Sequence, residues 1–360
     1  MLNIYLRKLH CHVETDEVGA DEPYAFVVAV NLSQPLPQFE VVRYGPFDDV
    51  DAREERLAPG ITHSFWGIDG QPAVLSNPNQ AIFIVAFMEN DNGNPEALRG
   101  LVKGIVASSL ASSVNAGKPR IVEALIRDIN SVLKTPTSVG LNLDDQIGPP
   151  TELSFSAHEL RTAESGQLVS KGLRIQGDGG DYTLTFEAVR SFPVIGAIRA
   201  KWIALGADTS PLRLPVDREL PTFDGTGRAQ NFQGGIVSWH PETGANTVWG
   251  LIGERWLQLG REAFGYPITD ELTTGNGRGK FNHFRALHLP GKPDASIFWS
   301  PTTGAHEIYG AIRAKWAEMG WERSPLGFPI SAEQSHPGGR IQRFERGSVF
   351  WSPATGAVVR

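Results

Sequence analysis

The sequence predicts a mainly β protein with α insertions, built from two parts of different design. Short strand-like runs separated by turn residues recur through the first 190 residues and predict a β-sandwich. One stretch inside that region, residues 95–135, has helical spacing instead. Beyond it, one sequence pattern occurs three times, which predicts a module of three repeats that each combine a helix with a β-hairpin.

Composition and charge support the division. The chain has 360 residues, of which 41% are hydrophobic and 20% charged, as is usual for folded domains. Residues 1–190 carry 25 acidic and 15 basic side chains, whereas residues 191–360 carry 15 and 18, and eight of the nine tryptophans lie in the second part. We therefore expect an acidic domain at 1–190 and a repeat domain at 191–360. Neither is basic enough to predict binding to nucleic acid.

Three local properties of the sequence argue against a transmembrane helix, a signal peptide and a disulfide-bonded fold. No window approaches the 18 consecutive apolar residues that a transmembrane helix needs. The first residues, Met1–Arg7, alternate like a strand and do not resemble a signal peptide, so a cytoplasmic location remains open. Cys11 is the only cysteine, which excludes an intramolecular disulfide and a zinc site built from several cysteines.

The first domain is predicted to contain strands and one helical insertion. The expected strands are 2–13, 25–32, 40–43, 81–88, 152–156 and 182–189. In the insertion, Ile121, Leu125, Ile129 and Val132 fall on one helical face, and Pro119 suits the first helical position. We expect residues 95–135 to form a helical hairpin.

Three acidic loops stand beside these strands. Residues 16–24, Asp-Glu-Val-Gly-Ala-Asp-Glu-Pro-Tyr, lead directly into a strand. Residues 89–93, Glu-Asn-Asp-Asn-Gly, follow another strand, and residues 144–148, Asp-Asp-Gln-Ile-Gly, follow the helical insertion. Together they resemble the C-two family of calcium- and lipid-binding β-sandwiches, whose first loop has Asp-x-x-Gly-x-x-Asp-Pro-Tyr and whose third has Asp-x-Asp and then Asp-x-Ile-Gly.

That resemblance implies a Ca²⁺ site formed by Asp16, Glu22, Glu89, Asp91 and Asp145. Physical chemistry points the same way, because several carboxylates converging on one end of a sandwich repel one another and a hard cation would relieve the repulsion. Bound Ca²⁺ could also bridge to anionic lipid head groups. The alternative is that the loops are simply solvated turns, in which Asp, Asn and Gly are common.

The second part repeats at spacings of 52 to 62 residues, with copies near 195–249, 250–309 and 310–360. Each copy has Gly-x-Ile-x-x-x-Trp, which places Ile and Trp on one face of a short helix, and then Leu-Gly or Met-Gly, which ends the helix. An alternating segment around a glycine turn predicts a hairpin. Because one helix and one hairpin cannot bury their own apolar faces, neighbouring copies must share a core.

These copies resemble the LGFP repeat, whose tetrapeptide stands here at residues 326–329. The second copy has Phe-Gly-Tyr-Pro at 264–267, whereas the first has Leu-Arg-Leu-Pro at 212–215 and lacks the aromatic residue. The family occurs in envelope-associated proteins of mycolate-containing actinobacteria. The resemblance implies an extracellular or cell-envelope module that binds or anchors, with polysaccharide or glycolipid as its partner.

Aromatic and acidic residues supply candidate ligand contacts. Tryptophans at the same position of every copy are expected in the core. Trp249 and Trp321 lie off the repeated pattern and are better candidates for a ligand surface, together with Tyr266 and Phe328. The recurring glutamates at positions 219, 271 and 333 are expected to cap backbone amides between copies, with a role in binding a polar ligand as the alternative.

Catalytic patterns are weak. Ser131 and Lys134 match Ser-x-x-Lys without a companion motif. His10 and His12 share a strand face but lack a third ligand. The sequence therefore predicts a non-enzymatic, two-domain binding or anchoring protein. The alternatives are a hydrolase acting on envelope material with acid and base at Glu89 and Asp91, and an intracellular structural or assembly component.

Overall fold

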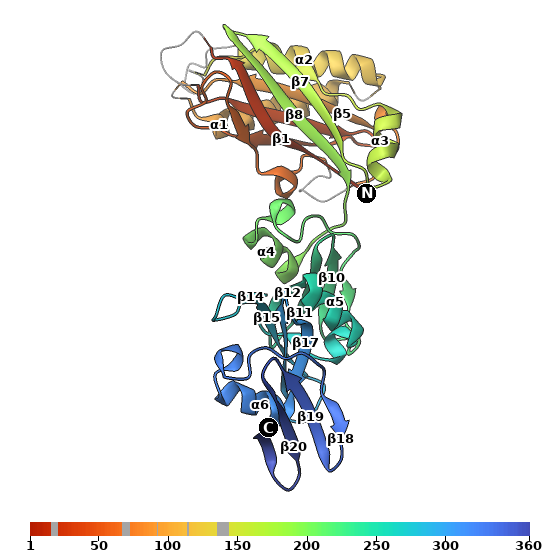
Figure 1. The fold of residues 1–360 in the computed structure, drawn as a ribbon. Helices are drawn as coiled ribbons and strands as arrows, with labels where there is room; N and C mark the ends of the chain where they lie inside the picture. The colour runs from red at the N-terminus through yellow and green to blue at the C-terminus, as the bar shows by residue number, and fades with distance from the viewer. Residues whose placement is uncertain (16–20, 67–72, 92, 114, 135–143) are drawn as a thin grey trace. The chain divides into compact units, whose positions relative to one another are not determined.

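The computed structural model describes residues 1–15, 21–66, 73–91, 93–113, 115–134 and 144–360. The chain divides into two compact units, Met1–Phe192 and Pro193–Arg360 (Figure 1). Antiparallel sheets dominate both units, and helices accompany them. The predicted fold class, mainly β with α insertions, is confirmed.

The first unit contains two four-stranded antiparallel sheets. The first sheet has the order β4-β1-β8-β7, with β1 at Leu2–Val13, β4 at Glu55–Leu57, β7 at Val169–Gly177 and β8 at Gly180–Arg190. The second has the order β3-β2-β5-β6, with β2 at Tyr24–Asn31, β3 at Gln38–Tyr44, β5 at Ala81–Met88 and β6 at Thr151–Glu152. Short 3-10 turns lie at Gly60–His63 and Pro78–Gln80.

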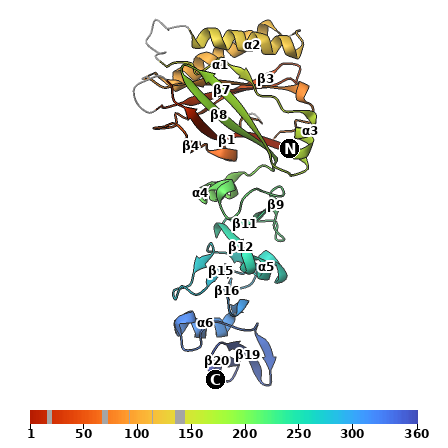
Figure 2. The same cartoon turned by 45° about the horizontal axis from the view of Figure 1, so that its top comes forward.

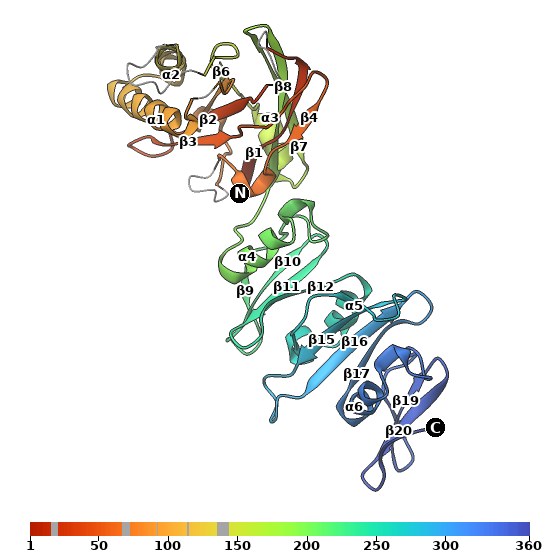
Figure 3. The same cartoon turned by 90° about the vertical axis from the view of Figure 1, so that its left-hand side faces the viewer.

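The helical insertion forms the expected hairpin, with α1 at Pro95–Ser112 and α2 at Lys118–Leu133. The helices cover the face of the second sheet that points away from the first sheet (Figures 2 and 3). Apolar side chains fill both interfaces, so β2 and β5 are buried on both faces, and this explains their nearly uninterrupted apolar sequences. The predicted strand at 152–156 is shorter than expected, because β6 ends at Glu152 and Ser156 caps helix α3, Ala157–Glu164.

In the second unit each copy has one helix, a 3-10 turn and a small antiparallel sheet (Figure 3). The helices are α4 (Gly196–Ala204), α5 (Gly250–Gln258) and α6 (Gly310–Glu318), followed by turns at Ala207–Thr209, Arg261–Ala263 and Trp321–Arg323. The strands are β9 Leu220–Pro221, β10 Arg228–Phe232, β11 Gly235–His240, β12 Gly244–Trp249, β13 Tyr266–Pro267, β14 Leu272–Thr273, β15 Lys280–Arg285, β16 Asp294–Ser300, β17 Gly304–Tyr309, β18 Gln334–His336, β19 Gly339–Phe344, β20 Gly347–Ser352 and β21 Gly356–Val359.

The helical tryptophans form the core of each copy, as the repeat predicted. Trp202, Trp256 and Trp316 are buried. Their indole N–H groups donate to the backbone carbonyls of residues 213, 265 and 327 at 2.8, 3.0 and 3.2 Å. Each ring contacts the phenylalanine of its own hairpin, at residues 232, 284 and 344. An indole thus joins the helix, the LGFP loop and the hairpin of one copy.

A buried carboxamide recurs in each hairpin and ties backbone segments together. The side-chain amide of Asn282 donates to the carbonyls of Thr247 in the first copy and Thr269 in the second, both at 2.9 Å. Gln342 donates in the same way to Glu307 and Ser331, at 2.8 and 2.9 Å. Because these carbonyls are withdrawn from water, the amides satisfy groups that would otherwise destabilise the junctions between copies.

Candidate functional site

The described residues of the three acidic loops (21–24, 89–91, 93 and 144–148) come together at one end of the second sheet of the first unit. β2 begins at Tyr24, β5 ends at Met88, and an isolated bridge between Met88 and Gln146 brings the third loop beside them. Glu22 donates its backbone N–H to the Glu89 carboxylate, and Glu89 donates its own N–H to the carbonyl of Asp145 at 2.8 Å.

At this end of the sheet, which we call the acidic rim, the carboxylates of Glu22 and Glu89 bond to the protein's own amides. Glu22 accepts a hydrogen bond from the Asn90 side chain at 2.9 Å, and Glu89 is only 3% exposed. Among the described residues, no group of three or more His, Cys, Asp or Glu side chains has the geometry to hold a metal ion. Asp16 lies outside the described residues. Four of the predicted ligands, Glu22, Glu89, Asp91 and Asp145, therefore lie at one rim, and Ca²⁺ binding there stays a prediction.

Two buried aspartates, absent from the predicted ligand set, hold the loops in place. Asp144 accepts from the Tyr24 hydroxyl at 2.7 Å and from the backbone N–H groups of Asp91 and Gly93 at 3.2 and 2.8 Å. Asp21 accepts from the Tyr182 hydroxyl and from both the backbone and side chain of Thr15. Burial and the hydrogen bond to Asp144 raise the pKa of Tyr24, so it remains a donor. These contacts make the two aspartates structural.

The other polar residues singled out in the first unit have local roles. Burial raises the pKa of the Cys11 thiol, which favours its unreactive protonated form. The ring of His12 bonds to the Thr183 hydroxyl at 2.8 Å, and His10 lies 3.8 Å from Glu55. Ser131 and Lys134 lie at the end of α2.

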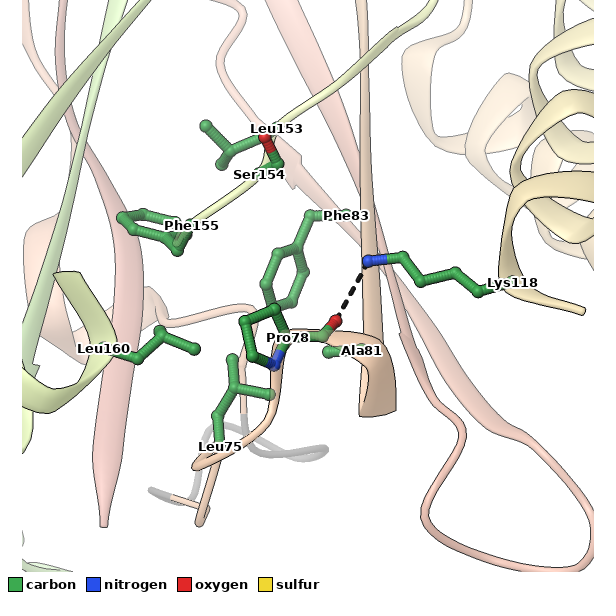
Figure 4. Close-up of a pocket in the computed structure, with 9 residues that line it drawn as sticks. All are labelled: Leu75, Pro78, Ala81, Phe83, Lys118, Leu153, Ser154, Phe155 and Leu160. Carbon is green, nitrogen blue, oxygen red and sulfur yellow. Dashed lines mark hydrogen bonds between the residues drawn. The ribbon is translucent and has the colours of Figure 1, made fainter. Parts of the chain in front are cut away.

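One apolar pocket lies between the second sheet and α3, with Phe83, Phe155 and Leu160 in its wall (Figure 4). Its main polar group, the Lys118 ammonium, donates to the carbonyl of Pro78 at 2.9 Å. The volume is about 40 Å³, whereas sites for small organic ligands measure roughly 300–1,000 Å³. The pocket is a packing defect rather than a ligand site.

Tyr266 and Phe328, predicted to face a ligand, are fully buried and have packing roles instead. The Tyr266 hydroxyl bonds to Thr222 and Asp224 of the preceding copy, at 2.6 and 2.7 Å. Phe328 occupies the equivalent position in the third copy, where it packs against the second copy. A Cβ atom on Gly279 would lie 2.7 Å from its ring. The aromatic residue of the LGFP tetrapeptide thus joins the second and third copies to the copies before them.

Trp249 and Trp321 differ from each other in what they face. The ring of Trp321 stacks on Phe298, with centroids 5.6 Å apart, and the Arg313 guanidinium lies 5.2 Å from its centroid. Protein side chains therefore cover much of Trp321. Trp249, at the end of β12 and directly before α5, is partly exposed and instead forms a hydrogen bond with the Glu271 carboxylate.

Glu271 belongs to a set of three side chains that recurs in every copy, which we call the Glu–basic–Trp set. The basic residue and the tryptophan are direct cross-strand partners in each hairpin, so their side chains lie on the same face of the sheet. The glutamate precedes the hairpin by nine residues or fewer. The members are Glu219, Arg228 and Trp239; Glu271, Lys280 and Trp299; and Glu333, Arg340 and Trp351.

Contacts within the set show that the glutamates face side chains rather than backbone amides, which corrects the expectation that they cap the backbone. Glu219 lies 3.9 Å from Arg228, and Glu333 pairs with Arg340. Burial raises the pKa of Glu219, opposed by Arg228. Burial likewise raises the pKa of Glu271, opposed by the hydrogen bond from Trp249 and by the charge of Lys280.

In the first copy the set lines a cavity of about 460 Å³ beside the start of α4. Ile195, Glu219, Arg228 and Trp239 contribute to its wall. The residue at the position of Ile195 is Trp249 in the second copy and Tyr309 in the third, and each interacts with a charged member of its set. The three tryptophans of the sets are partly exposed, in contrast to the buried helical ones.

Sequence reasoning missed Trp239, Trp299, Trp351 and their basic partners. Repetition alone assigned every recurrent tryptophan to the core. The available signal was the hairpin register, since a basic residue opposite a tryptophan places a charge beside the ring. Such a face offers an aromatic surface, a cation and a carboxylate together, which suits a ligand rich in hydroxyl groups.

The second unit is thus a repeat module in which each copy combines a closed core with an open polar face. A family model for the LGFP repeat matches residues 212–263, 264–324 and 326–359, so the C-terminal half of the chain consists of LGFP repeats, a family often linked to association with the cell envelope. No curated protein matches the chain. The likeness of residues 1–190 to the C-two family remains a prediction. None of the helices in the described ranges is long and apolar enough to span a membrane.

Proposed function

We propose that the protein binds its ligand without chemically changing it, and that its LGFP repeats hold a polysaccharide or glycolipid of the cell envelope on the three Glu–basic–Trp sets. The observation that carries this proposal is the recurrence of the same three chemistries at equivalent, partly exposed positions. A residue needed only for folding would be expected inside the copy, where the helical tryptophans lie.

The chemistry of the set matches a sugar. An indole packs against the apolar face of a pyranose ring, while the carboxylate and the basic group hydrogen-bond to hydroxyls at the ring's edge. The 460 Å³ cavity of the first copy falls in the range of small-ligand sites. Three copies on one chain would also bind a polymer with higher avidity than any single set.

Retention on purified envelope polysaccharide tests the proposal. We expect the full chain to be retained, and the single variants Trp239→Ala, Trp299→Ala and Trp351→Ala each to weaken retention, with the triple variant losing it. The matched control is Phe223→Ala, because Phe223 is 57% exposed and lies outside the sets. Unchanged retention of the triple variant, with its folding verified by circular dichroism, would contradict the proposal.

The location of the native protein separates this proposal from an intracellular assembly role. We expect cell fractionation to recover the protein with the envelope. Recovery in the cytoplasmic fraction alone would favour the structural alternative.

Ca²⁺ binding by the acidic rim is a second proposal, supported by the gathering of Glu22, Glu89, Asp91 and Asp145 at one end of a sheet. We expect calorimetric titration with Ca²⁺ to give saturable heat in the wild type. Asp91→Ala and Asp145→Ala should reduce it. Absence of heat in the wild type would remove the proposal.

A further inference from the structure

A second cavity in the repeat unit, of about 570 Å³, is formed by residues from all three copies. The first copy contributes Glu242, the second Arg285, Lys292 and Asp294, and the third Arg313, near the start of α6. It shares no lining residue with the cavity of the Glu–basic–Trp set in the first copy.

Part of the wall of this cavity comes from a turn that is longer in the second copy than in the other two. Phe284 and Trp299 are separated by 14 residues, whereas the equivalent pairs, Phe232 with Trp239 and Phe344 with Trp351, are separated by six. The eight additional residues lie at the turn between β15 and β16, and they include Lys292. A longer turn that adds a charged cavity wall is a local departure from the repeat.

Charges in the cavity do not balance. Arg285 bonds to Asp294 at 2.8 Å, and Lys292 to Glu242 at 2.5 Å. These two pairs leave the third cation, Arg313, without an ion pair. Within the described chain, no carboxylate oxygen lies within the 4.0 Å of its nitrogens that defines an ion pair. The lining therefore carries one positive charge in excess.

The orientation of the Arg313 guanidinium is fixed by neighbouring side chains. Its Nε–H donates to the hydroxyl of the fully buried Ser296 at 2.8 Å, and that hydroxyl is 2.7 Å from Nδ1 of His283. Burial and the nearby Arg313 charge lower the pKa of His283 to about 4, so at neutral pH its ring is uncharged and accepts the Ser296 proton. Trp321 packs against the guanidinium. These contacts occupy Nε and one face of the guanidinium, and its two terminal nitrogens make no hydrogen bond to the described part of the chain.

We propose that this cavity binds a single oxyanion, a carboxylate or a phosphodiester carried on a polar ligand, with Arg313 as its principal contact. A partly desolvated cation with a fixed orientation gains more from an anionic partner than a flexible surface cation does. One excess positive charge favours a monoanion. The site uses none of the Glu–basic–Trp residues, so it stands independently of the proposed function.

Titration of the full chain with D-glucuronate, dimethyl phosphate and neutral glucose, followed by NMR of the indole N–H of Trp321, tests the site. We expect saturable shifts with an oxyanion and none with glucose. Tighter binding of glucuronate would identify an acidic sugar as the source of the anion, and tighter binding of dimethyl phosphate a phosphodiester head group. No saturable shift with either anion would overturn the proposal.

Three variants sharpen the test. Arg313→Gln, which can still donate to Ser296, should weaken binding at least about tenfold. Glu242→Gln removes the partner of Lys292 and should tighten binding about threefold, a gain that a misfolded variant would not give. Arg199→Gln, at the equivalent position of α4, should have no effect. Equal affinities of wild type and Arg313→Gln would refute the assignment.

Discussion

The acidic rim of the first unit and the Glu–basic–Trp sets of the second unit both consist of charged residues that lie beside strands in the sequence. In the structure, however, their environments differ. In the rim, Asp144 and Glu89 bond to the chain's own backbone amides. In the sets, each carboxylate stands beside a basic side chain and a partly exposed indole. The difference is that the carboxylates of the rim hold loops of the chain together, whereas those of the sets face other side chains.

The same contrast exists between tryptophans inside and outside the cores. Trp316 is fully buried, and its replacement by alanine should lower the free energy of unfolding by about 4 kcal/mol, because a large cavity forms. Trp351→Ala, in the same copy, should cost far less stability while it weakens retention on polysaccharide. Urea denaturation with near-ultraviolet circular dichroism measures the first effect. Equal destabilisation by both changes would erase the distinction between core and ligand-facing indoles.

Two consecutive aspartates in the rim, Asp144 and Asp145, should differ in their contribution to stability, by a smaller amount than the two tryptophans do. Asp144→Ala leaves the Tyr24 hydroxyl and two backbone N–H groups without their acceptor, and should destabilise the protein by about 3 kcal/mol. Asp145→Ala, at an exposed position, should cost about 0.5 kcal/mol. Denaturant unfolding of the two variants compares them directly. A similar loss in both would mean that Asp144 is not the residue that holds the loop.

The weakest expected effect is a pH dependence of the repeat unit. His283 has a pKa of about 4 when folded, below the ordinary value of 6.5, so the unfolded chain binds more protons between these values. Stability should therefore fall as pH decreases from 6.5 towards 4, by roughly 1–2 kcal/mol after allowance for solvent screening. Asp224 contributes to the pH dependence at a lower pH. Burial alone would raise its pKa, but hydrogen bonds from Tyr266, Thr222 and two backbone amides lower it to about 2.

Calorimetry at pH 7 and pH 5 checks this prediction. His283→Asn should remove most of the difference between the two melting temperatures, whereas His336→Gln, at an exposed position, should preserve it. A wild-type melting temperature that does not change between these pH values would contradict a neutral, buried His283.

The sequence by itself determined the local units. Ile and Trp four residues apart fixed a short helix and its buried face, and alternation around a glycine fixed each hairpin, because these periods are properties of the backbone. The helical hairpin of the first unit followed from the same reasoning, whereas the gathering of the acidic loops was expected from the resemblance to the C-two family. The strand β7 and the helix α3 were missed, since Lys171 interrupts the apolar alternation of β7 and α3 is only two turns long.

Only the tertiary structure decided what each recurrent side chain faces. Tyr266 and Phe328 are buried because the preceding copy provides a close backbone surface at Gly227 and Gly279. The first copy has Leu214 at this position, and it is the first of the three matched repeats. Trp239, Trp299 and Trp351 remain partly exposed because the shared cores are already filled by the helical indoles. A sequence period specifies the direction of a side chain within its own element, whereas burial depends on the neighbouring segment that packs against it.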